Sequence, residues 1–153
     1  YAAAATEQSV ALLITLAVVA PFLLWNGVIG FVVYLHHTNP GIAWFQNRQE
    51  WQRCRAYLTS TACVRFPWGM DRLLHNIMEH NAHHLNPGIP MFMLRAAQQV
   101  LRDRFPDLCD YRITRRTYMD VVQRCKLYDF ANHQWLDFNG QVTARVTLAN
   151  AAA

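Results

Sequence analysis

The stretch SVALLITLAVVAPFLLWNGVIGFVVYL, residues 9–35, contains no charged side chain and few polar ones. As a single helix, about 27 residues would be roughly 40 Å long, which exceeds the ~30 Å hydrocarbon core of a bilayer. The stretch therefore predicts one transmembrane helix, tilted or projecting from the bilayer, with a kink at Pro21. A signal peptide is the alternative, but the run is too long and no basic residue precedes it.

The charges lie almost entirely on one side of this stretch. All Lys and Arg residues fall between Arg48 and Arg145, and only Glu7 is charged ahead of the stretch. The positive-inside rule then places the C-terminal part in the cytoplasm. The net charge of +4 suits anionic lipid headgroups better than nucleic acid, which we do not expect as a partner. We expect a transmembrane helix in residues 1–38 and a cytoplasmic domain in residues 39–153.

Cysteines and the chain ends add two expectations. The four cysteines show no C-x-x-C spacing, so in a cytoplasmic domain they are expected to be free thiols packed as small apolar groups: Cys54, Cys63, Cys109 and Cys125. The alanine runs at residues 2–5 and 151–153 are as typical of artificial ends as of natural sequence. A single span this close to the N-terminus resembles the last span of a longer protein.

The rest of the chain indicates three helices and a hairpin. Asn39-Pro40-Gly41 should end the apolar helix, and helices are predicted over residues 70–85, 90–105 and 115–127. The helix over residues 90–105 either packs on its own domain or lies in the plane of the membrane surface. Asn139-Gly140 suits a type I′ turn in a hairpin over residues 133–146. The predicted fold is mainly α and integral to the membrane, with one transmembrane helix, a cytoplasmic helical cap and a short C-terminal β-hairpin.

Residues 75–84, HNIMEHNAHH, place four histidines and a carboxylate within ten positions. On one helix these side chains would share half of the surface, because successive residues rotate by about 100°: His75, Glu79, His80, His83 and His84. Imidazole is the commonest protein ligand for transition metals, so we interpret the cluster as metal-binding. Glu79 could bind metal or orient an imidazole. The spacing is not the H-E-x-x-H of zinc hydrolases.

Two other histidine positions are open to a structural interpretation. His36 and His37 close the apolar stretch, either as interfacial polar residues or as functional groups, since dehydrating an ionisable residue at such a point is costly. His133 stands alone between Asn132 and Gln134, and we interpret it as a structural histidine.

Several separate blocks resemble membrane fatty-acid desaturases, in particular the C-terminal half of the acyl-lipid (omega-6/Δ12-like) branch. The blocks are HNIMEHNAHH at 75–84, IPMFMLRAAQ at 89–98, FLLWNGVIGFVVYLHHTNP at 22–40 and CKLYDFANHQWLDF at 125–138. The resemblance implies paired transmembrane helices, a cytoplasmic cap, and three histidine clusters that hold two irons for O₂-dependent desaturation of an acyl chain. It also implies electrons from ferredoxin or a cytochrome b5. Removing hydrogen from an unactivated C–H needs such a metal oxidant.

The resemblance also assigns residues. The late histidine cluster of the family corresponds to His80, His83 and His84, and the histidines that end its last membrane span correspond to His36 and His37. Together with His75, these five residues are the candidate metal ligands. Glu79 and Asn39 are candidates for supporting those ligands. Two features depart from the family pattern. No histidine precedes residue 36, and Asn39 stands where the family usually has the second histidine of H-T-H-P, so it would at best hold a water. Cys63 also stands where relatives often carry histidine.

The first hypothesis is the C-terminal portion of a di-iron acyl desaturase that completes its iron site with groups outside this chain and is inactive by itself. The second is a truncated, catalytically inactive desaturase-like subunit with a structural role in a larger membrane complex. A third is a small membrane protein that binds zinc through His80, His83 and His84. Expected partners are the lipid bilayer, an acyl lipid or fatty acyl chain, the electron donor and other membrane protein chains.

Overall fold

The computed structural model describes residues 8–148, so the two alanine runs lie outside the described residues. The contacts among these residues define two units, with the boundary between Tyr34 and Leu35. The chain is mostly helical, and its strands form two small sheets.

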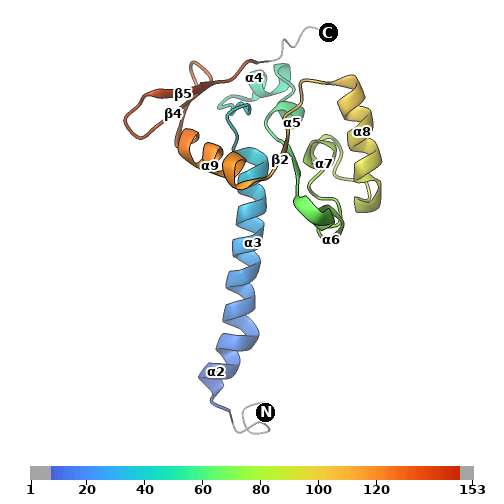
Figure 1. Cartoon of the computed structure of the whole chain (residues 1–153), viewed down its shortest axis with the longest axis vertical. Helices are drawn as coiled ribbons and strands as arrows, with labels where there is room; N and C mark the ends of the chain where they lie inside the picture. Colours follow the sequence, from blue (N-terminus) through green and yellow to red (C-terminus); the bar gives the residue numbers. More distant parts are fainter. Residues whose placement is uncertain (1–7, 149–153) are drawn as a thin grey trace. The chain divides into compact units, whose positions relative to one another are not determined.

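The first unit is built from consecutive helical segments: α2 (Val10–Ile14), the π-helical turn η1 (Thr15–Val19) and α3 (Ala20–His37), which continues into the second unit (Figure 1). Ser9 begins the helix, because its hydroxyl accepts the N–H of Leu12 at 3.2 Å. The π-helical turn η1 ends two residues before Pro21, the residue at which the sequence predicts a kink. Pro21 has no N–H to donate to the preceding turn, and a widened turn is a common accommodation.

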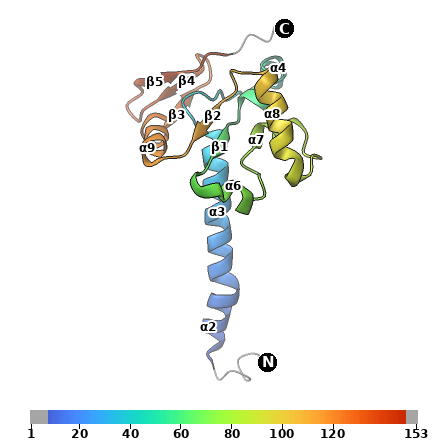
Figure 2. The same cartoon turned by 45° about the vertical axis from the view of Figure 1, so that its right-hand side comes forward.

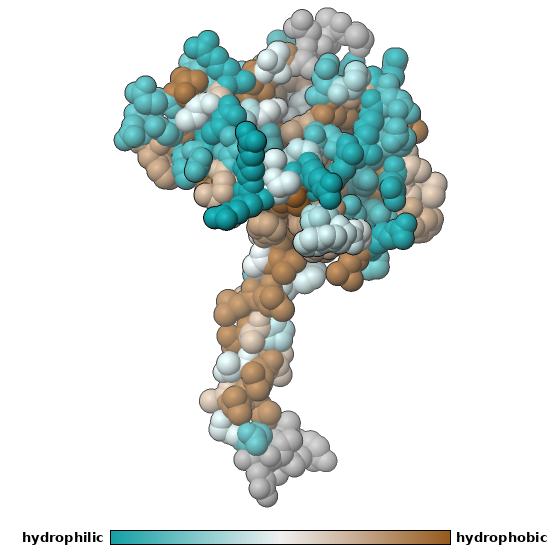
Figure 3. Space-filling view, in the orientation of Figure 1, coloured by the Kyte–Doolittle hydropathy of each residue, from teal (hydrophilic) through white to brown (hydrophobic). Residues whose placement is uncertain are grey.

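Most side chains of residues 8–34 are apolar and exposed. Leu24 is 70% exposed and Trp25 65% exposed, and Figure 3 shows hydrophobic side chains along the helix. Residues Val10–His37 form a helix that is long and apolar enough to cross a membrane. Exposed apolar surface of this extent is unusual in water and suits a lipid environment.

The second unit contains short helices and strands (Figures 1 and 2). In chain order they are α4 (Arg48–Arg53), α5 (Ala56–Thr59), β1 (Cys63–Arg65), η2 (Pro67–Gly69), α6 (Met70–Leu73), α7 (His80–Leu85), η3 (Met91–Met93), α8 (Leu94–Arg104), β2 (Asp110–Arg112), α9 (Arg115–Arg124), β3 (Leu127–Asp129), β4 (Gln134–Leu136) and β5 (Val142–Arg145). Strands β1 and β2 pair in parallel, and β3, β4 and β5 form an antiparallel sheet in that order.

The predicted helix over residues 90–105 is confirmed, with a 3₁₀ turn, η3, before α8. Its face with Leu94, Gln98 and Leu101 is buried, and a core cluster joins Leu94 and Leu101 to Leu58 and Ala82. Helix α8 therefore packs on its own unit, beside α7 and α5. This is the first of the two expectations for this helix, the other being a helix in the plane of the membrane surface.

The predicted third helix is confirmed as α9, which begins at Thr114 with a reciprocal capping box to Thr117. It ends at Arg124, with Cys125 as the residue after the helix, rather than at Leu127, because Leu127 already belongs to β3. Strand β3 was not predicted, and it turns the predicted hairpin into a three-stranded sheet.

The hairpin of β4 and β5 is confirmed, but its predicted type I′ turn is wrong. Of the two central residues only Gly140 has a positive φ, at 78°. Asp137 explains the difference, since its carboxylate accepts the N–H groups of Asn139 and Gln141 at 2.8 Å each. Its carbonyl also accepts the N–H of Gly140, which closes a β-turn over residues 137–140.

The predicted continuous helix over residues 70–85 is wrong. Helix α6 ends at Leu73, and α7 begins only at His80. His75 and Asn76 adopt left-handed conformations, with φ of 51° and 59°, and the N–H of Asn76 donates to the Asp71 carbonyl at 2.8 Å. This arrangement closes a helix C-terminus, so residues 75–84 do not share one helical face.

Candidate metal site

Helices α3 and α7 bring three of the predicted histidines together. One ligand atom each from His37, His80 and His84 lie within 4.8 Å of one another. The Nε2 atom of His80 is 3.3 Å from that of His37 and 3.1 Å from that of His84. His37 comes from the end of α3, and His80 and His84 lie one turn apart on α7.

Backbone carbonyls orient two of these rings. Nδ1 of His37 is 3.1 Å from the carbonyl oxygen of Ser60, and Nδ1 of His80 is 3.2 Å from that of Ile77. A carbonyl oxygen only accepts hydrogen bonds, so each Nδ1 carries the proton, and in the neutral ring Nε2 then keeps its lone pair. This pairing with a backbone carbonyl is the usual support of a metal-bound imidazole.

Burial and neighbouring charge lower the pKa of two of these histidines, His80 and His84. The pKa of His80 is lowered to about 2, first by burial and then by repulsion from His36, His84 and His37. The pKa of His84 is also lowered, by burial and by His37 and His83. Metal ions bind the deprotonated imidazole, so these surroundings favour the form that is competent for metal.

The spacing of the nitrogens fits a single ion. Metal–imidazole bonds of roughly 2.0–2.1 Å in tetrahedral geometry separate two ligand nitrogens by about 3.3–3.4 Å. The distances from Nε2 of His80 to Nε2 of His84 and of His37, 3.1 and 3.3 Å, are close to this value, and the ligand atoms of His37 and His84 lie within 4.8 Å of each other. Imidazole nitrogen suits iron, zinc and copper alike, so the donors alone do not select the metal.

The other candidate residues surround the cluster or lie apart from it. The ring of His36 is buried and stacks on His80 with centroids 3.9 Å apart, and the His83 ring lies 5.5 Å from that of His80. His75 is exposed in the turn after α6. Glu79 faces Cys63 and Arg102 rather than an imidazole.

Asn39 also has a local role. Its side-chain oxygen accepts the N–H of Gly41 at 2.9 Å and so closes the turn that follows α3. His133 is buried and bonds Glu50 at 2.8 Å and Tyr128 at 3.2 Å. These contacts agree with its interpretation as a structural histidine.

Sequence reasoning missed the polar residues that support the cluster. Gln98 and Asn81 are fully buried, and Arg102 is half-buried. Gln98 lies four residues after Leu94 and three before Leu101, on the face that packs against the unit. A glutamine at such a position could have been noticed as a buried polar group that needs partners.

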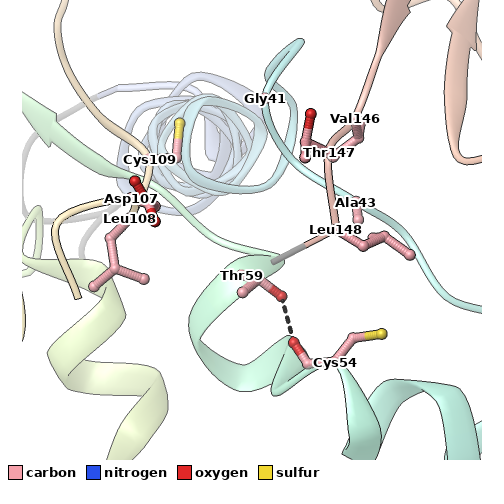
Figure 4. Close-up of a pocket in the computed structure, with 10 residues that line it drawn as sticks. All are labelled: Gly41, Ala43, Cys54, Thr59, Asp107, Leu108, Cys109, Val146, Thr147 and Leu148. Carbon is pink, nitrogen blue, oxygen red and sulfur yellow. Dashed lines mark hydrogen bonds between the residues drawn. The ribbon is translucent and has the colours of Figure 1, made fainter. Parts of the chain in front are cut away.

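A cavity of about 360 Å³ lies elsewhere in the second unit (Figure 4). Its lining includes Cys54, Thr59, Asp107 and Cys109, and none of the candidate histidines. Burial raises the pKa of Cys109 to about 12, so this thiol stays protonated. All four cysteines are free, as expected.

Comparisons with known proteins all indicate the same protein family. Residues 2–116 match the family described as fatty acid desaturase. The chain is 30% identical over 110 residues to the chloroplastic omega-6 fatty acid desaturase of Spinacia oleracea, covering 71% of this chain and 24% of that protein. It is 29% identical over 119 residues to the sn-1 oleoyl-lipid 12-desaturase of a Picosynechococcus species, covering 77% of this chain and 34% of that protein. The chain thus spans between about a quarter and a third of these relatives.

Proposed function

The chain belongs to the fatty acid desaturase family, and we propose that it contributes His37, His80 and His84 to the di-iron site of a membrane acyl desaturase. The observation that carries this proposal is the geometry of His37 and His80. Each ring fixes Nδ1 on a backbone carbonyl and directs Nε2 at its neighbour. Such an arrangement prepares donors for a cation.

The residues have separate roles in this proposal. His37 and His80 provide supported nitrogens, and the more exposed His84 provides a third from the next turn of α7. His36 and His83 flank His80 and are the nearest further candidates for ligands. Iron bound there would supply the O₂ activation that breaking an unactivated C–H bond requires. The remaining ligands would come from outside this cluster.

Membership of the family supports proposals for the substrate and the partners. The relatives named above act on fatty acids or oleoyl lipids, and we propose an acyl lipid or fatty acyl chain as the substrate here. The electron donor would be a ferredoxin or a cytochrome b5. The apolar helix Val10–His37 would span the bilayer and residues 39–148 would lie on its cytoplasmic side, with other membrane protein segments completing the site.

A structural role in a membrane complex is the second candidate. The observation that favours it is Asn39, whose side chain closes a turn at the position where the family usually has a histidine. Cys63 gives similar support, because it bonds Glu79 and Arg102 where relatives often carry histidine. In this role the chain would keep the fold of the family and bind no iron in the assembled complex.

Metal titration tests the first proposal. We expect the purified chain in detergent to bind Fe(II) anaerobically, and Co(II) as a spectroscopic probe, with loss of binding in His80→Ala. His75→Ala is the matched control, because His75 is exposed and lies outside the cluster. Equal binding by wild type and His80→Ala would contradict the proposal.

The assembled protein separates the two candidates. Iron and new double bonds are measured after the chain is joined to a desaturase segment that carries the other histidine clusters. Iron together with a desaturated acyl product supports the enzyme. A stable, iron-free complex that forms no product supports the structural role.

A further inference from the structure

We infer that Gln98 and Arg102 of α8 are positioning residues that hold the start of α7, and with it His80, in the geometry of a metal ligand. The inference rests on the proposed metal role of the histidine cluster. Gln98 and Arg102 lie one helical turn apart, so they present neighbouring side chains to α7.

Helix α7 needs outside support at its start. It has only six residues, and Glu79, the residue before it, makes no side-chain capping bond. Helices this short are unstable alone, and their first N–H groups lack partners within the helix. The carboxamide oxygen of Gln98 accepts one of these groups, the N–H of Ala82, at 3.0 Å. A residue of α8 thus takes the place of a local cap.

Gln98 also links α7 to the backbone that orients His37. Its amide donates to the Asn81 side-chain oxygen at 3.2 Å, and the Asn81 amide donates to the carbonyls of Leu58 and Thr61 at 2.9 Å each. Thr61 directly follows Ser60, whose carbonyl faces Nδ1 of His37. The network therefore fixes His80 and His37 against the same stretch of chain.

Arg102 fixes the residue on the other side of His80. Its Nη2 donates to the Glu79 carboxylate at 2.9 Å and its Nε to Asp110 at 2.6 Å. Asp110 also accepts from Arg65, which ties the arrangement to β1 and β2. Glu79 is only 13% exposed at its side chain, so loss of Arg102 would leave a poorly solvated carboxylate without its cation.

The contacts of α8 thus reach residues 79, 81 and 82, which flank His80, and touch none of the three ligand nitrogens. Residues that orient ligands in this way typically change metal affinity about 10- to 100-fold when they are replaced. A residue that only stabilises the fold would change the melting temperature and leave the affinity of the folded protein unaltered.

The test is Co(II) titration of the full chain, with the visible spectrum as the record of coordination geometry. Gln98→Met and Arg102→Met should bind Co(II) about 10- to 100-fold more weakly and alter its spectrum. Gln99→Met and Arg104→Met, on the exposed side of the same helix, are the matched controls and should match wild type. Gln98→Glu keeps an acceptor for the Ala82 N–H and should recover part of the affinity lost in Gln98→Met.

The outcomes are separable. Circular dichroism first establishes which variants fold. If Gln98→Met does not fold, Arg102→Met and Gln98→Glu test the inference instead. Gln98→Glu should bind Co(II) more weakly than wild type, because it can no longer donate a hydrogen bond to Asn81. Folded variants with wild-type affinity and spectrum would overturn the inference alone. If wild type binds no Co(II), or binds it equally well without His80, the metal role itself fails.

Discussion

Adjacent histidines at the end of α3 have different surroundings. His37 directs Nε2 at His80, whereas the His36 ring lies face to face with His80, at an interplanar angle of 17°. We therefore expect His37→Phe to abolish Co(II) binding. His36→Phe keeps a stacked ring and should change the affinity by less than about 5-fold, because stacking contributes roughly 1 kcal/mol. Titration of both variants measures the difference, and the reverse order would show that His36 is the ligand.

Asp110 predicts a pH dependence of stability. Burial alone would raise its pKa, but hydrogen bonds from Arg65 and Arg102, together with their charges, outweigh burial and lower it below the ordinary value of 3.8. A carboxyl group whose pKa is lower in the folded state stabilises the fold at pH values above its unfolded-state pKa. This contribution is lost as the pH falls through the folded-state pKa. Asp110→Asn should therefore lower the free energy of unfolding by about 2 kcal/mol at pH 7.

Urea unfolding followed by tryptophan fluorescence checks this dependence at pH 7 and at pH 3. The gap between wild type and Asp110→Asn should narrow at pH 3. Asp103→Asn, at an exposed position on α8, should differ little from wild type at either pH. If the difference in unfolding free energy between wild type and Asp110→Asn were larger at pH 3 than at pH 7, the predicted direction of the pH dependence would be wrong.

At the scale of elements, the hydrophobic pattern predicted the helices that pack through one apolar face. Helix α8 buries Leu94 and Leu101 on one face, and α9 buries Val121. The break at His75 could not be predicted in this way, because residues 70–85 carry no Gly or Pro at the point where α6 ends. The candidate site was predicted as a helical face, but its geometry depends on α3 and α7, which are distant in sequence.

His75→Gly distinguishes the observed break from a continuous helix. His75 has a φ of 51°, which is unfavourable for a residue with a side chain and easy for glycine. The substitution should therefore raise the free energy of unfolding by up to about 1 kcal/mol. In the interior of a continuous helix it would instead cost about 1 kcal/mol.

Thermal unfolding in detergent shows whether His75→Gly raises or lowers the stability of the chain. Arg72→Gly, within α6, is the matched control and should destabilise the chain. Destabilisation of similar size by both variants would indicate that residues 70–85 form one helix in solution.

At the scale of the whole molecule, composition predicted an apolar helix followed by a basic domain, since both are properties of long stretches. The convergence of His37 with His80 and His84 could be expected only from the family resemblance. The hydrogen bonds of Ser60, Asn81 and Gln98 that support it depend on packing between segments far apart in the chain. Periodicity carries no information about such pairings.

The asymmetry of charge gives the last prediction, the side of the membrane on which the second unit lies. Every Lys and Arg follows residue 47, so residues 39–148 are expected on the cytoplasmic side and Gln8 on the opposite side. Cysteines placed at Asn139, in the exposed β4–β5 turn, and at Gln8 report the two sides. A maleimide that cannot cross membranes should label Asn139→Cys only in inside-out vesicles and Gln8→Cys only in right-side-out vesicles. Wild type in each preparation corrects for the native cysteines. Labelling of both positions from one side would mean that the apolar helix does not span the bilayer, and the opposite pattern would place the histidine cluster away from cytoplasmic electron donors.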